Sequence, residues 1–202
     1  MPANTPVDDI TAVILAGGKA RRMDGEDKGL INLNGRTLID YIISALRPQA
    51  GDILINANRN RQQYSRYGLP VVADMLGDYF GPLVGMATGM HSTDKPYIVT
   101  VPCDSPFIPD MLVETLYQAL YDAQAAISVA HDGTRLQPVF ALLRCELLTD
   151  LLSYLNTGGR KIDTWYERQP LAIADFSNLP ETFLNLNTPE DKLALESQIA
   201  GQ

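Results

Sequence analysis

The chain has 202 residues, of which 46% are hydrophobic and 20% charged, a composition typical of a soluble globular domain with a full core. Its formal net charge of -8 argues against a basic face for nucleic acid, so any anionic ligand must meet a local cluster of cations. With two distant cysteines, no signal segment and no apolar run long enough to span a bilayer, the sequence predicts a cytoplasmic protein without disulfides, zinc or membrane partners.

Short apolar runs alternate with stretches of helical periodicity along the first half of the chain. Strands are predicted at residues 10–16, 52–56, 69–73 and 96–101. The first of them is continuously apolar and rich in β-branched residues, which is typical of a parallel strand buried on both faces. Helices are predicted after Thr37, a suitable N-cap, and after Pro109.

Further strands are predicted at residues 125–130 and 138–143, and a closing helix from Thr188. The alternation of strands and helices predicts an α/β fold: a doubly wound, mostly parallel sheet with a Rossmann-like nucleotide-binding N-terminal half. There is no internal repeat, low-complexity segment or linker. We therefore expect a single domain over residues 1–202.

The first predicted strand runs directly into paired glycines, Gly17 and Gly18, which are followed by several cations. The cations are Lys19, Arg21, Arg22, Lys28 and Arg36. Glycine lets backbone N–H groups approach a phosphate closely, and lysine and arginine offset its charge. The sequence therefore predicts a phosphate-binding loop, with a solvated basic loop as the alternative. The glycine patterns of dinucleotide dehydrogenases and P-loop NTPases are both absent.

Two aspartates follow predicted strands, at the edge of the sheet where ligands bind. Asp104 follows the fourth strand and stands between Pro102 and Pro106, which stiffen its backbone. Because Mg²⁺ takes one or two carboxylates and completes its shell with water and phosphate oxygens, Asp104 alone could hold it. A helix cap is the alternative. Asp74 follows the third strand and could bind ribose, phosphate or metal-bound water, or form an Asx-turn.

Side-chain amides occupy two further positions of this kind. Asn56 ends the second predicted strand and could bind a base or sugar, or serve as a turn residue. Asn185 and Asn187 lie two residues apart, on one side of an extended segment, where capping of the next helix is the alternative. Neither His91 nor His131 lies in a nucleophile motif, which argues against a hydrolase.

With these segments in place, the chain resembles the molybdenum cofactor guanylyltransferase family, MobA, within the larger group of sugar-nucleotide-like nucleotidyltransferases. The matching segments are residues 15–18, 22–23, 27–28, 56–59, 74, 81–85, 102–106 and 185–190. They follow the family order from about residue 10 to about residue 195. The resemblance implies Mg²⁺-dependent transfer of GMP from GTP to molybdopterin, giving molybdopterin guanine dinucleotide and pyrophosphate.

The resemblance also implies roles for individual residues. A nucleotide-binding part would span residues 8–110 and an acceptor-binding part residues 111–198. GTP would be bound by Leu15, Ala16, Gly17, Gly18, Lys28, Asn56, Asp74 and Asp104. Asp104 would also hold Mg²⁺, and Lys28 and Arg22 would act with it in catalysis. The molybdopterin acceptor would meet Asn185, Asn187, Arg160 and Lys161.

One position departs from the family pattern, since Asp24 stands where glycine usually follows the arginine and methionine of the loop. A carboxylate beside phosphates predicts weaker nucleotide binding. Two alternatives stay open: cytidylyl or uridylyl transfer on the same fold, and a nucleotide or cofactor carrier without turnover. We expect a monomer or weak oligomer, with delivery of the cofactor to molybdenum enzymes as a further role.

Overall fold

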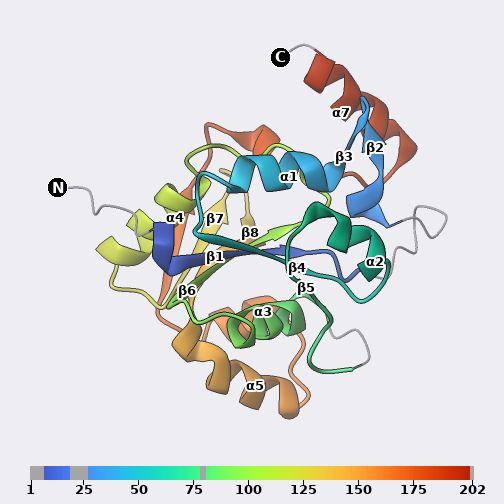
Figure 1. Ribbon diagram of the computed structural model, residues 1–202. Helices are drawn as coiled ribbons and strands as arrows, with labels where there is room; N and C mark the ends of the chain where they lie inside the picture. The colour runs from blue at the N-terminus through green and yellow to red at the C-terminus, as the bar shows by residue number, and fades with distance from the viewer. Residues whose placement is uncertain (1–6, 19–26, 78–80, 201–202) are drawn as a thin grey trace.

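The computed structural model describes residues 7–18, 27–77 and 81–200, and its centre is a seven-stranded sheet (Figure 1). The strand order is β5-β4-β1-β6-β8-β7-β9. The strands are β1 (Ile10–Leu15), β4 (Asp52–Asn56), β5 (Val71–Val72), β6 (Tyr97–Pro102), β7 (Ile127–His131), β8 (Leu136–Arg144) and β9 (Leu171–Asp175). Every pairing in this sheet is parallel except the two made by β8, which confirms the prediction of a mostly parallel sheet.

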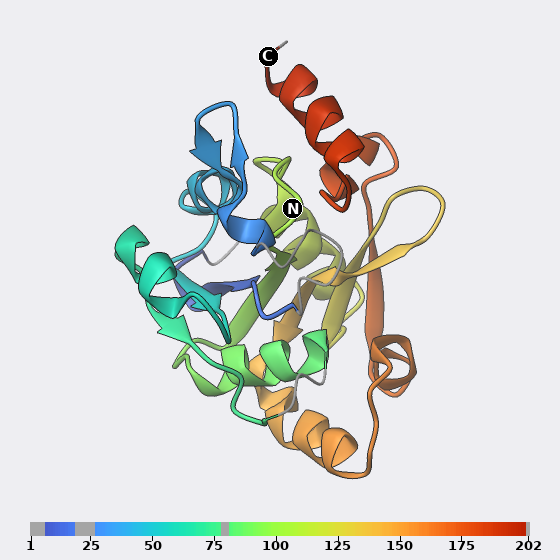
Figure 2. The same cartoon turned by 90° about the vertical axis from the view of Figure 1, so that its right-hand side faces the viewer.

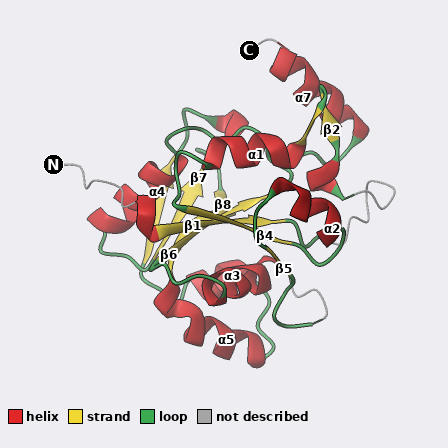
Figure 3. Cartoon of the chain, viewed as in Figure 1, coloured by secondary structure: helices red, strands yellow, loops and turns green. Residues whose placement is uncertain are grey.

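Helices cover both faces of the sheet, as the prediction of a doubly wound fold requires (Figure 3). One face carries α1 (Leu38–Leu46) and α4 (Leu112–Asp122), and the other carries α3 (Pro82–His91), α5 (Leu148–Asn156) and α6 (Ile162–Tyr166). The sheet lies between two apolar clusters, one for each helix layer. None of the described helices is long and apolar enough to cross a membrane.

A smaller unit stands beside the main sheet, where the strands β2 (Asn32–Leu33) and β3 (Arg36–Thr37) form a hairpin against α7 (Pro189–Ala200) (Figure 1). Its apolar centre contains Leu33 and Leu38 from the hairpin and α1, and Leu186 and Leu195 from the C-terminal segment. The remaining elements are α2 (Arg61–Tyr64) and the 3₁₀ turns Val7–Asp9, Lys28–Leu30, Ser65–Tyr67, Cys145–Leu147 and Pro180–Phe183.

Several local predictions are confirmed, and others differ for physical reasons. Helix α1 begins after Thr37, whose backbone N–H donates to the Asp40 carboxylate at 3.3 Å. The strand predicted at residues 69–73 is reduced to β5, beyond Pro70, which has no N–H for the ladder. Helix α3 begins at Pro82, and proline suits the first helical position. Helices α5 and α6 and strand β9 were not predicted from the sequence.

The parallel strands leave their carboxyl ends at one edge of the sheet, which faces the viewer in Figure 2. Backbone pairing continues into the loops: the Ala16 N–H donates to the carbonyl of Asn56 at 2.8 Å, and the Cys103 N–H donates to that of Leu15 at 3.2 Å. The loops after β1, β4 and β6 therefore start from fixed and adjacent positions.

Helix α3 lies unusually close to β1. A Cβ atom at Gly89 would stand 2.7 Å from a methyl carbon of Val13, a distance that real Cβ contacts do not show. Val13 is completely buried in the centre of the sheet and cannot move aside without disturbing its neighbours. Glycine at position 89 therefore sets the distance between helix and sheet.

We predict that Gly89→Ala lowers the free energy of unfolding by about 1–3 kcal/mol, the usual cost of overpacking. This outcome runs against helix propensity, on which alanine is better than glycine by about 1 kcal/mol. Urea unfolding gives the value, and Gly77→Ala is the control because a Cβ there meets nothing within 4 Å. A Gly89→Ala protein as stable as the parent would contradict this account of the packing.

Candidate active site

A cavity of about 520 Å³ opens where the parallel strands end. Its lining includes every residue predicted from the sequence to bind the nucleotide: Leu15, Ala16, Gly17, Gly18, Lys28, Asn56, Asp74 and Asp104. Val139 on the antiparallel strand β8 closes part of the wall, together with Gly81 and Pro82 at the start of α3. Residues from eight separate segments of the chain thus surround one space.

An ion pair occupies the β6 side of the cavity. The ammonium group of Lys28 donates to Oδ2 of Asp104 at 2.8 Å and to Oδ1 of Asn187 at 2.5 Å. The side chains of Lys28 and Asp104 are only 21% and 18% exposed, so water screens their charges less than at an open surface. The structure therefore brings together three predicted residues from distant parts of the sequence.

The C-terminal segment holds the Asp104 loop in place. The Leu186 N–H donates to the backbone carbonyl of Asp104 at 2.9 Å, and the fully buried Ser105 hydroxyl lies 2.5 Å from Oδ1 of Asn185. Asn185 therefore turns to Ser105, and of the two predicted amides it is Asn187 that lines the cavity. The two side chains thus have different partners, Ser105 and Lys28, and their proposed contact with the acceptor stays a prediction.

Asp27, which the sequence analysis did not single out, also lines the cavity and is only 7% exposed. Its carboxylate accepts from the Tyr64 hydroxyl at 2.5 Å and from the Asn60 amide at 3.2 Å. Burial, reinforced by nearby Cys103 and Asp27, raises the pKa of Tyr64 far above its usual range, so the phenol stays a donor. Asp27 could have been predicted as a site residue, because it directly precedes Lys28 in a segment that matches the family.

The β5 side of the cavity carries a second carboxylate, held by neutral donors. Asn56 donates to Oδ1 of Asp74 at 2.9 Å, and Asn58 donates to Oδ2 at 2.7 Å. Asn58 also accepts from the Asp74 backbone N–H at 2.8 Å. Because Asn56 is only 2% exposed, it acts on this side of the cavity mainly by fixing Asp74.

Arg36, which the structure describes among the other predicted cations, does not line the cavity. Lys19, Arg21 and Arg22, together with the unusual Asp24, lie outside the described residues. Arg36 lies 4.5 Å above the Tyr41 ring and donates to the Asp40 carbonyl and Ser44, so it belongs to the surface of α1 and not to a phosphate loop. Lys28 is the cation that the described part of the chain places in the cavity wall.

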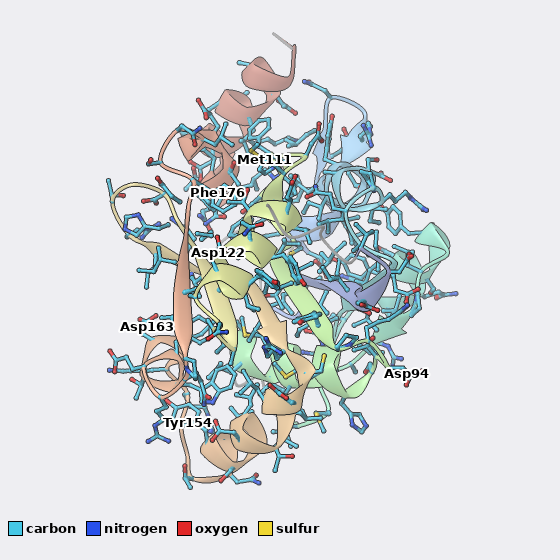
Figure 4. All side chains as sticks on the ribbon, turned by 90° about the vertical axis from the view of Figure 1, so that its left-hand side faces the viewer. Asp94, Met111, Asp122, Tyr154, Asp163 and Phe176 are labelled. Atoms are coloured by element: carbon cyan, nitrogen blue, oxygen red, sulfur yellow. The ribbon has the colours of Figure 1, made fainter. Side chains whose placement is uncertain are left out.

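Arg160 and Lys161 lie on the connection between α5 and α6, and neither lines the cavity. Arg160 donates to the carbonyl of Leu155 at 2.8 Å, while the Lys161 carbonyl accepts from the hydroxyl of Tyr154, which Figure 4 labels in the helix layer of α5. These contacts give the two residues a local structural role. Their proposed contact with the acceptor stays a prediction.

Cys103 lines the cavity beside Asp104 but is suited to packing and not to nucleophilic chemistry. Burial raises the pKa of its thiol far above the usual range, and the charge of Asp104 acts in the same direction. Since a thiolate is the reactive form, Cys103 stays an inert thiol.

Comparison with known proteins places this chain in a family. The model of the MobA-like NTP transferase domain matches residues 12–171. A protein of Shewanella sediminis named molybdenum cofactor guanylyltransferase is 48% identical over 191 residues, covering 95% of this chain and 97% of its own length. One of the same name from Shewanella halifaxensis is 46% identical over 193 residues, covering 96% of both chains.

The fold has a solved counterpart in molybdopterin-guanine dinucleotide biosynthesis protein A from Archaeoglobus fulgidus. That structure superposes with a TM-score of 0.78 at 22% identity, over 96% of this chain and all of the other. At this identity the likeness concerns the fold. The family model covers most of the chain and both Shewanella relatives extend along nearly its whole length, so the chain belongs to the MobA-like NTP transferase family.

Proposed function

We infer that the protein is a molybdenum cofactor guanylyltransferase, which transfers GMP from GTP to molybdopterin with release of pyrophosphate. The observation that carries this inference is a single cavity with the Lys28–Asp104 pair at one side and an amide-held carboxylate, Asp74, at the other. The relatives named molybdenum cofactor guanylyltransferase support the choice of nucleotide and acceptor.

The strand order suggests how GTP lies in the cavity. Asp104 follows β6 and Asp74 follows β5, and three strand spacings between them amount to about 14 Å. A nucleotide spans a comparable length between its α-phosphate and the far edge of its base. We therefore place the phosphates at Lys28 and Asp104 and the guanine at Asp74, with Leu15 to Gly18 along the ribose and phosphates.

The β5 carboxylate suits guanine in particular. Guanine presents two adjacent donors, N1–H and the N2 amino group, which one carboxylate can accept together. Cytosine and uracil do not present such a pair of donors. Asp74 therefore favours guanine over the pyrimidines that the sequence alone left open.

The residues of the β6 side fit a magnesium site. Among the described residues no group of three or more histidine, cysteine, aspartate or glutamate side chains could enclose a metal ion. Asp104 offers a single carboxylate at an open cavity, and Mg²⁺ needs few protein ligands when substrate phosphates are present. Magnesium held by Asp104 would offset the negative charge that the phosphates carry during transfer.

The chain's own contribution to the reaction is positioning and charge. The terminal phosphate of molybdopterin attacks the α-phosphorus of GTP in line with the departing pyrophosphate, and the new phosphoanhydride bond replaces the one that breaks. Lys28 lies where it can stabilise charge on the transferred group, and Asn187 restricts its ammonium group. No general base is required, because the attacking phosphate is already ionised at neutral pH. Use of GTP, with both described cysteines as free thiols, supports action in the cytoplasm.

We predict that Asp104→Asn lowers the rate of pyrophosphate release from GTP, measured with Mg²⁺ and molybdopterin, by about 100-fold or more. The substitution removes the carboxylate that would hold Mg²⁺ beside the phosphates. Asp110→Asn is the matched control, because that side chain is exposed and does not line the cavity. Turnover with CTP and not GTP would move the activity to cytidylyl transfer. GTP binding without turnover in the parent protein would indicate a carrier.

We predict that Asp74→Ala weakens GTP binding by about tenfold or more, a typical contribution of a paired base contact, while CTP and UTP binding changes little. The measurement is the dissociation constant of each triphosphate with Mg²⁺, by calorimetry, and Asp110→Ala serves as the control. If all triphosphates lose affinity by the same factor, Asp74 contacts ribose or phosphate and not the base.

A further inference from the structure

Asn58 stands outside the residues so far given a direct role, yet it makes the closest contacts to Asp74. Its amide nitrogen donates to Oδ2 of Asp74 at 2.7 Å and its amide oxygen accepts from the Asp74 backbone N–H at 2.8 Å. A single side chain therefore holds both the carboxylate and the backbone of the same residue. Two contacts of this kind fix the rotation of the carboxylate about its side-chain bonds.

The fixed rotation of the Asp74 carboxylate decides where its remaining acceptor positions point. A carboxylate offers about four lone-pair positions, two on each oxygen. Asn56 occupies one on Oδ1 and Asn58 occupies one on Oδ2. With the contacts of the described residues counted, one position is left on each oxygen, and Asp74 lines the cavity. The remaining pair matches two adjacent donors, which is the pattern of guanine N1–H and N2–H.

The loop that carries Asn58 also contacts the loop after the neighbouring strand β1. A Cβ atom at Gly17 would stand 3.1 Å from the Asn58 amide nitrogen, and Arg59 donates to the Gly18 carbonyl at 3.3 Å. On the Asp74 side, the Met75 N–H donates to the Thr88 hydroxyl at 3.0 Å, which fixes the backbone beyond Asp74. The residues after β4 thus set the positions of the β1 loop and of Asp74 together.

We propose that Asn58 is a positioning residue for base selection: it orients the Asp74 carboxylate so that both of its free acceptor positions meet guanine. The proposal rests on the inferred guanylyltransferase function and adds a residue that acts on the base through another side chain. It separates Asn58 from Lys28 and Asp104, because loss of Asn58 should affect the choice of base and leave the phosphate contacts in place.

Inosine triphosphate tests the proposal, since its base keeps N1–H and lacks the N2 amino group. In the parent protein with Mg²⁺, we expect calorimetry to show GTP binding about tenfold or more tighter than ITP. In Asn58→Ala, GTP loses two well-placed contacts and ITP loses one, so this ratio should fall at least about fivefold.

Asn178→Ala is the matched control, because it removes the same amide from an exposed turn after β9 and should leave the ratio unchanged. Should Asn58→Ala fail to fold, Asn58→Ser gives the same comparison, since its side chain is too short to hold both atoms of Asp74. If Asn58→Ala weakens GTP and ITP binding by the same factor, so that the ratio is unchanged, the proposal is overturned. The proposed function still holds in that case, provided that the parent protein prefers GTP. A parent that prefers CTP to GTP would overturn the proposed function itself.

Discussion

The parallel pairing of β1 with β4 and β6 is the constraint on which the candidate site depends. Each of these strands is buried, and their apolar side chains leave no freedom of register without exposing the core. Their polar continuations must then emerge together at one edge. The paired glycines Gly17 and Gly18, the Asn56 amide and Asp104 line one cavity for this reason, although Gly17 and Asp104 lie 87 positions apart in the sequence.

Of the three described aspartates that line the cavity, Asp104 and Asp74 are kept distinct by their partners. Asp104 pairs with a cation, and its loop is fixed by a backbone hydrogen bond from Leu186. Asp74 is held by neutral amides and keeps acceptor capacity for a ligand. A cationic partner suits a group that meets metal and phosphate, whereas amide donors orient a carboxylate without neutralising it. In the proposed function, one carboxylate would thus hold Mg²⁺ at the β6 side of the cavity, and the other would recognise guanine at the β5 side.

Much of this arrangement was predictable from the sequence because it follows from local pattern. Alternating apolar runs predicted the sheet, and the rule that ligands bind beyond the strand ends pointed to Asp74 and Asp104. Contacts between side chains were not predictable in this way. Such contacts depend on how loops fold back, which no periodicity encodes. Examples are the partners of Asp27 and Asp74, the turn of Asn185 toward Ser105 and the attachment of Arg36 to α1. Helix α6 and strand β9 have five residues each, so tertiary packing decides them, whereas α5 buries Leu151, Tyr154 and Leu155 at helical spacing and was predictable from pattern although it was not predicted.

The contact between Lys28 and Asn187 has a consequence for folding kinetics. It joins residues 159 positions apart, so its formation closes a very long loop, and an ordered sheet between the two residues shortens the flexible chain that must be closed. The small apolar unit of α7 and the β2–β3 hairpin supplies the surface that brings the two segments together. A partly folded chain with a complete central sheet would still lack a finished phosphate pocket. A ligand that requires this contact binds the finished chain better than an intermediate that lacks it, and so stabilises the finished chain.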